Sequence, residues 1–176
     1  SEGLKKEMEK RKISQVLELA GGLVPRGILT SENPDIRYIE TDLPEMSMEK
    51  KKIISELDPE FSKRENYTVT SLNVIDPEEF SNIGNMFGKG SVAVINEGLL
   101  PYLTAEEKGV VAKNIHDLLV IHGGAWITTD ISNGERMRKI IEIFPDAAQV
   151  NQKIQDFTGK DMRANGIGGG KEGTLE

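Results

Sequence analysis

Short runs of apolar and β-branched residues alternate along the chain with longer stretches in which apolar residues recur at helical spacing. The short runs predict five β-strands, at residues 16–19, 36–40, 67–72, 92–96 and 125–130. Strands that alternate with helices in this way are typical of a parallel sheet covered by helices on both faces. The pattern therefore predicts a doubly wound, mostly parallel α/β fold of the Rossmann-like type.

Two helices have specific starting signals. Thr104 and Glu107 form a capping box ahead of an apolar helical stretch that Gly123 ends. Asp76 followed by Pro77 places a hydrogen-bond acceptor and a proline where a second helix begins. Helical periodicity predicts three further helices, at residues 46–57, 137–144 and 147–157.

The 176 residues have the length of one domain. We expect that domain to span residues 1–164, because residues 165–176 are rich in glycine and have no periodicity. This last segment is interpreted as a flexible tail or a remnant of cloning.

Charge and composition narrow the class of partner. The 29 acidic and 22 basic side chains give a formal net charge of −7, and no basic run exceeds three residues, which argues against a nucleic-acid partner. The chain has no cysteine, so it forms no disulfide. No apolar run approaches the roughly 18 residues of a membrane span, and residues 1–12 are too charged for a signal peptide. We therefore expect a cytoplasmic protein without a membrane partner.

The turn after the first strand and the end of the second strand carry the first candidate site residues. Glu18 lies near the end of the first predicted strand, which leads into a turn of small residues, Ala20, Gly21 and Gly22. Asp42 lies 20 residues after Gly22, just past the second predicted strand. A carboxylate at that place is typical of a ribose-binding residue in a nucleotide fold. Asp42 could equally cap the helix that follows it.

The turn departs from the fingerprint of a dinucleotide site. That fingerprint has glycine at its first, third and sixth positions, where this chain has Ala20, Gly22 and Pro25. A pyrophosphate is therefore disfavoured, and an adenosine cofactor without phosphate fits better. A nicotinamide-dependent oxidoreductase stays as the alternative enzyme.

Two later strand ends add polar side chains. Asn73 could accept a hydrogen bond from an adenine amino group. A ligand of such a fold binds beyond the carboxyl ends of the strands. The loop after the fourth strand places Glu97 and the ring of Tyr102 beside that cleft, and both side chains attract a cation. An adenosine ligand with a cationic centre indicates S-adenosylmethionine.

Three segments, at residues 16–26, 38–44 and 96–103, resemble in order and spacing the leucine carboxyl methyltransferase family. That family includes polyketide O-methyltransferases of the tetracenomycin type and has the class I S-adenosylmethionine-dependent methyltransferase fold. The resemblance extends over residues 13–157, and its most specific part is the Glu-Gly-Leu-Leu-Pro-Tyr-Leu loop at residues 97–103.

The resemblance implies a role for each candidate residue. The turn at residues 20–22 would lie against the methionine part of the cofactor, Asp42 would hold the ribose, Asn73 with Val74 would meet the adenine, and Glu97 would line the methionine end. The complete set of expected cofactor-binding residues is Glu18, Ala20, Gly21, Gly22, Asp42, Leu43, Asn73, Val74, Glu97, Gly98 and Tyr102. No metal site is expected.

The resemblance implies methyl transfer to an oxygen of a small molecule or a carboxylate. It does not identify the acceptor, because the basic N-terminal segment and the C-terminal hairpin typical of the family are not visible in the sequence. Ala20 and Asn73 also replace residues that are commonly Gly and Asp. A non-catalytic or truncated methyltransferase-like binding protein is therefore the other alternative. His116 and His122 are not expected to act as bases, since both fall in the capped helix away from the strand ends.

Overall fold

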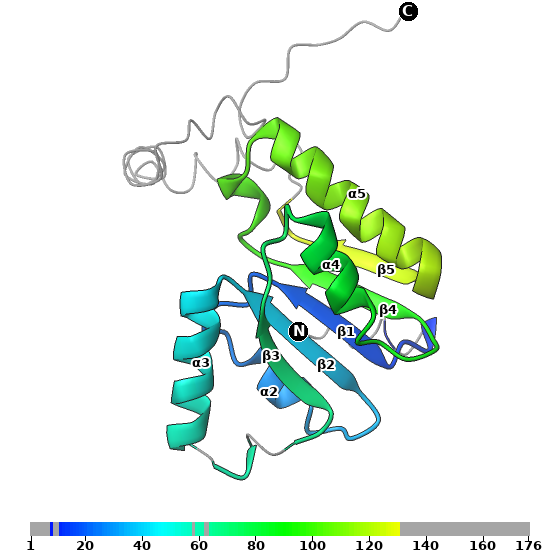
Figure 1. Cartoon of the computed structure of the whole chain (residues 1–176). Helices are drawn as coiled ribbons and strands as arrows, with labels where there is room; N and C mark the ends of the chain where they lie inside the picture. The colour runs from blue at the N-terminus through cyan, green and yellow to red at the C-terminus, as the bar shows by residue number, and fades with distance from the viewer. Residues whose placement is uncertain (1–7, 9–10, 58, 62–63, 131–176) are drawn as a thin grey trace, which may run out of the picture.

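The computed structural model describes residues 8, 11–57, 59–61 and 64–130. Its centre is a sheet of five parallel strands (Figure 1), and all five predicted strands are confirmed. They are β1 (Gln15–Leu19), β2 (Arg37–Asp42), β3 (Tyr67–Ser71), β4 (Val92–Asn96) and β5 (Gly124–Thr128). β1 and β4 read as continuous buried runs, because helices or chain segments cover both of their faces.

The helices lie on both sides of the sheet (Figure 1). They are α2 (Arg26–Thr30), α3 (Pro44–Leu57), α4 (Pro77–Gly84) and α5 (Ala105–His122), with the 3-10 turn η2 (Leu100–Tyr102) after β4. α4 and α5 cover one face, where Phe80 and Ile115 pack with Leu17, Ile39 and Val94 of the strands. The doubly wound fold is therefore confirmed.

The other face of the sheet has a smaller apolar core. Ile28 of α2 and Ile54 of α3 pack there with Tyr67 and Val69 of β3. Beside this cluster the same face carries buried carboxylates from β1 and β2, which are described below.

Both capped helices begin where the sequence predicts. The Asp76 side chain accepts hydrogen bonds from the backbone N–H groups of Glu78 and Glu79, and Thr104 and Glu107 form a reciprocal capping box. Gly123 ends α5 with a positive φ of 72°, a conformation that favours glycine.

Three differences from the predicted elements stand out. α2 was not predicted, because it has five residues and no side-chain cap. α3 begins two residues before the predicted start, at Pro44, since proline suits the first turn of a helix. β5 ends at Thr128, before Asp130.

Some predictions fall outside the described residues. These are the helices at residues 137–144 and 147–157, the tail at residues 165–176 and the domain boundary at residue 164. No helix in the described part of the chain is both long and apolar enough to span a lipid bilayer.

The strand order is β3-β2-β1-β4-β5, so the chain moves outward from β1 to β3 and then returns to the other side of β1. The order therefore reverses between β1 and β4, which pair in parallel. Connections leave the carboxyl ends of these two strands toward opposite faces of the sheet, and a ligand of a doubly wound fold lies in the crevice between them.

Candidate functional site

The turn after β1 packs tightly against the end of β2. Ala20 and Gly22 have positive φ values of 53° and 52°, and the Gly21 N–H donates to the Thr41 carbonyl at 3.0 Å. A Cβ atom on Gly21 would lie 2.5 Å from the Glu40 Oε1 atom, whereas one on Gly22 would meet no atom within 4 Å. Gly21 is thus required for packing against a carboxylate of the protein, and Gly22 borders open space.

Asp42 ties the end of β2 to this turn. Its Oδ2 atom accepts from the Gly22 N–H at 2.8 Å and its Oδ1 atom from the Leu43 N–H at 2.7 Å. The described contacts of Asp42 include none to a backbone N–H within α3, so the structure does not support the helix-cap interpretation. An ionised carboxylate has about four acceptor positions, which leaves capacity for two further donors.

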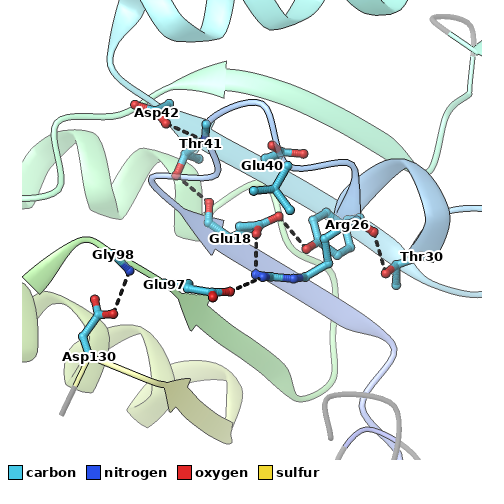
Figure 2. A network of polar contacts seen from close by, with 12 residues as sticks. Glu18, Arg26, Thr30, Glu40, Thr41, Asp42, Glu97, Gly98 and Asp130 are labelled. Atoms are coloured by element: carbon cyan, nitrogen blue, oxygen red, sulfur yellow. Dashed lines mark hydrogen bonds and ion pairs between the residues drawn. The ribbon is translucent and has the colours of Figure 1, made fainter. Parts of the chain in front are cut away.

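A chain of ion pairs crosses the crevice between β1 and β4 (Figure 2). The Arg26 guanidinium donates from Nη1 to Glu18 Oε1 at 2.7 Å and from Nη2 to Glu97 Oε2 at 2.5 Å. The second oxygen of Glu18 accepts from the Tyr38 hydroxyl at 2.6 Å. The side chain of Glu18 is 3% exposed and that of Glu97 is 63% exposed, so Arg26 connects a buried carboxylate to one in solvent.

Burial shifts the pKa values of Glu18 and Tyr38, the two buried groups in this row of ion pairs and hydrogen bonds. It raises the pKa of Glu18, although the Tyr38 hydrogen bond and the Arg26 charge oppose the shift. Burial beside the Glu18 carboxylate also raises the pKa of Tyr38, so the tyrosine stays protonated and its hydroxyl donates a hydrogen bond to Glu18. Both carboxylate oxygens of Glu18 therefore accept hydrogen bonds within the protein, and its side chain is buried.

Glu40 lies in a second buried network behind the turn. The Lys50 ammonium donates to Glu40 Oε1 and, at 2.7 Å, to the Val24 carbonyl. The Tyr67 hydroxyl donates to Glu40 Oε2 at 2.8 Å. Glu40 consequently faces α2 and α3. Asp42, two residues later at the end of the same strand, instead reaches the turn after β1.

The loop after β4 is held by Asp130. The Asp130 carboxylate accepts from the backbone N–H groups of Gly98, Leu99 and Leu100 at 2.7, 2.8 and 2.9 Å, and from Asn96 Nδ2 at 2.7 Å. Figure 2 shows the bond to Gly98. In the sequence, Asp130 is marked only as an acidic residue at the end of the predicted fifth strand. Its carboxylate fixes the backbone that carries Glu97.

The remaining predicted residues follow β3 and β4. Asn73 is exposed, and its Oδ1 atom accepts a long hydrogen bond of 3.4 Å from the Ile75 N–H. The Val74 carbonyl accepts from Asn114 Nδ2 at 3.0 Å, which links this loop to α5. Tyr102, in η2, is 44% exposed, so its ring is available to a ligand.

The structure therefore joins Asp42 directly to the turn and joins Glu97 to β1 through Arg26. Asn73 and Val74 lie at the same edge of the sheet, after β3, without a described contact to these groups. Arg26, like Asp130, is a site residue that sequence reasoning missed. It lies in a segment that carries the family resemblance, but its partner Glu97 is 71 residues away in the chain.

Other polar features lie elsewhere. His116 is exposed on α5, and His122 packs edge-on against the Phe87 ring at the opposite end of the sheet from the crevice. Across residues 11–57 and 64–130, no three His, Asp or Glu side chains are grouped as metal ligands.

A shallow groove opens beside the ion-pair chain at the carboxyl ends of β4 and β5. Its lining residues are Arg26, Ile95, Asn96, Glu97, Ile127, Thr128 and Thr129. The groove thus combines apolar side chains with hydrogen-bonding and charged groups.

No protein-family model and no curated protein sequence matches this chain. Solved structures do match it. An O-methyltransferase family protein from Burkholderia thailandensis is 20% identical, with a TM-score of 0.56 over 84% of this chain and 40% of its own. A SAM-dependent methyltransferase from Anabaena variabilis is 14% identical, with a TM-score of 0.54 over 81% of this chain and 57% of its own.

A third similar structure is an O-methyltransferase from neocarzinostatin biosynthesis in complex with S-adenosyl-L-homocysteine. It is 15% identical, with a TM-score of 0.51 over 72% of this chain and 37% of its own. This chain thus spans between 37% and 57% of the length of these three proteins. Its five-stranded parallel sheet, with helices on both faces, has the Rossmann-like class I methyltransferase fold.

Proposed function

We propose that this chain binds S-adenosylmethionine and belongs to a methyltransferase that transfers the methyl group to an oxygen. The observation that carries the proposal is the junction between Asp42 and the turn after β1, at the point where the strand order reverses. There a carboxylate with unused acceptor capacity stands beside a glycine whose Cβ position is empty space.

The residues at the crevice fit the parts of this cofactor. Asp42 would accept from the two ribose hydroxyls, and the backbone at Gly22 leaves room for the methionine part. Asn73 and Val74 would border the adenine, while Glu97, Gly98 and Tyr102 would lie near the sulfonium end. When bound, the cofactor supplies an electrophilic methyl group on a positively charged sulfur.

The chain's own contribution to transfer is positioning. Asp130 fixes the loop that carries Glu97 through three backbone N–H groups, and the ion pairs of Arg26 fix the distance between β1 and that loop. An acceptor in the groove beside Glu97 would meet the hydroxyls of Thr128 and Thr129. Holding an acceptor in line with the methyl group is a large part of the acceleration in such reactions.

A carboxylate acceptor suits these residues better than a hydroxyl. A carboxylate is already ionised at neutral pH and needs no general base, whereas a hydroxyl does. Glu18, the buried carboxylate nearest to the groove, is occupied by Arg26 and Tyr38. This assignment, and membership of the leucine carboxyl methyltransferase family, are part of the proposal.

Ligand-dependent unfolding tests the proposal. S-adenosylmethionine and S-adenosylhomocysteine should each raise the melting temperature, and at 100 times the dissociation constant the stabilisation is about 2.7 kcal/mol. NADH serves as the control, since the turn departs from the dinucleotide pattern at Ala20 and Pro25. Stabilisation by NADH alone would replace the proposal with the oxidoreductase alternative, and no shift with any of the three ligands would reject cofactor binding by this chain.

A further inference from the structure

We propose that Arg26 is a specificity-determining residue: by pairing with Glu97 across the crevice, it sets how strongly the site prefers a cationic ligand to a neutral one of the same shape. The inference rests on the proposed function, since the two ligands compared are S-adenosylmethionine, which has a sulfonium, and S-adenosylhomocysteine, which has a neutral sulfur. It changes the simplest expectation for Glu97, which is that its carboxylate attracts the sulfonium unopposed.

The geometry gives Arg26 this position. Its guanidinium lies between Glu18, near the end of β1, and Glu97, in the loop after β4. Arg26 therefore connects the carboxyl ends of the two strands that bound the crevice. The Arg26 side chain is 17% exposed, and it borders the groove at the ends of β4 and β5. Lys50, a buried cation nearby, contacts Glu40 and the Val24 carbonyl instead.

Charge arithmetic shows what the pairing does. With both carboxylates ionised, the group formed by Glu18, Arg26 and Glu97 carries one net negative charge. The pairing places the guanidinium 2.5 Å from the exposed carboxylate, so a ligand in the crevice meets a close ion pair instead of an isolated anion. Removing Arg26 would make the group more negative, and removing the Glu97 charge would make it neutral.

These two changes should act in opposite directions on ligand preference. Arg26→Gln should increase the ratio of the dissociation constant of S-adenosylhomocysteine to that of S-adenosylmethionine, by about threefold or more. Glu97→Gln should decrease the same ratio. Both ligands have the same amino, carboxyl and adenosine groups, so contacts to those groups cancel in the ratio.

The experiment is isothermal titration of both ligands into the wild-type chain and four variants. Arg26→Lys keeps the charge and should keep the wild-type ratio. Lys113→Gln removes the same charge from an exposed pair with Asp117 on α5 and should leave the ratio unchanged, because that pair is solvent-screened. Arg26→Gln and Glu97→Gln are the two test variants.

Each outcome bears on the proposal. An increase in the ratio for Arg26→Gln with none for Arg26→Lys supports it. An equal loss of affinity for both ligands in Arg26→Gln would mean that Arg26 binds their shared carboxylate, and would overturn it. If Arg26→Gln does not fold, the decision falls to Glu97→Gln, and an unchanged ratio there overturns the proposal. If the wild-type chain binds neither ligand, the proposed function fails, and the role of Arg26 fails with it.

Discussion

At the scale of single residues, one buried carboxylate explains two glycines. A Cβ atom on Gly21 would lie 2.5 Å from Glu40 Oε1, and one on Gly27 would lie 2.6 Å from Glu40 Oε2 and 2.7 Å from the Tyr67 ring. Glu40 therefore occupies space that side chains at either position would need. Because Lys50 and Tyr67 also hold Glu40, it has little freedom to move away.

We expect Gly21→Ala to lower the free energy of unfolding by about 1 to 3 kcal/mol, the usual cost of overpacking a well-packed site. Gly109→Ala is the matched control: Gly109 lies in α5, and a Cβ atom there meets nothing within 4 Å. That control should gain about 0.5 to 1 kcal/mol from helix propensity. Urea denaturation measures both, and a neutral Gly21→Ala would mean that Glu40 is free to move.

Asp42→Asn should weaken binding of S-adenosylmethionine at least tenfold, because loss of a charge-assisted hydrogen bond typically costs about 1.5 to 3 kcal/mol. Glu45→Gln is the control, since Glu45 is an exposed acidic residue in the first turn of α3. Glu40→Gln is a poorer control, because it leaves the buried Lys50 ammonium without its carboxylate. Equal losses of affinity for Asp42→Asn and Glu45→Gln would show that Asp42 affects binding only through the net charge of the protein.

At the scale of elements, β5 positions the loop after β4 through a single side chain. Asp130 follows β5 and accepts from three consecutive backbone N–H groups, those of Gly98, Leu99 and Leu100. Trp126 of β5 also donates from Nε1 to the Asn96 Oδ1 atom at 2.7 Å. The geometry of the crevice at β4 therefore depends on the adjacent strand.

Asp130→Ala should lower the free energy of unfolding by about 1.5 to 3 kcal/mol, because the loop loses a charged acceptor for several donors. Amide hydrogen exchange should accelerate at Gly98, Leu99 and Leu100 more than in α5. Asp117→Ala, which removes an exposed carboxylate from α5, should change stability by no more than about 0.5 kcal/mol. Unchanged exchange at the three loop amides would contradict the assigned role of Asp130.

The strands and capped helices could be predicted because their signals are local. A buried apolar run identifies β4, and the Thr104 capping box identifies the start of α5. α2 could not be predicted, because five residues without a capping side chain leave no pattern.

The same distinction applies to the site. The relation between Gly22 and Asp42 follows from their spacing in a βαβ unit, and the structure joins them at 2.8 Å. Arg26 and Asp130 act on the loop after β4, whose residues are 71 and about 30 positions away in sequence, so their partners could be found only from the folded chain. The ligand-binding roles of the predicted site residues stay predictions.

At the scale of the whole molecule, the two faces of the sheet differ in chemistry. The face covered by α4 and α5 is apolar, whereas the face covered by α2 and α3 also buries Glu18 and Glu40 with their cationic and tyrosine partners. Every buried side-chain nitrogen or oxygen in the described part of the chain has a hydrogen-bond partner. The charged face is therefore fully satisfied, and its stability depends on protonation.

Burial raises the pKa of Glu18 above its ordinary value of 4.5, so the folded chain binds this proton more tightly than the unfolded chain does. Stability attributable to Glu18 should therefore fall as pH rises from about 4.5 through the raised pKa. Glu18→Gln removes this titration, so the difference in unfolding free energy between variant and wild type should shift in favour of the variant over that range. Urea denaturation of both proteins across the range measures it, and parallel pH curves would contradict the assignment.

The strand order also governs when a ligand site can exist during folding. β1 pairs with β2 by closing a short loop of chain. The segment between β1 and its other partner, β4, is much longer, because it contains β2, α3, β3 and α4. Closing the longer loop costs more chain entropy, so β1, β2 and β3 should associate before β4 docks. A partly folded chain would then have Asp42 and the turn but only one wall of the crevice, because Glu97 arrives with β4. Recognition of a cofactor should therefore be a late event in folding, and a bound cofactor would selectively stabilise the docked state of β4.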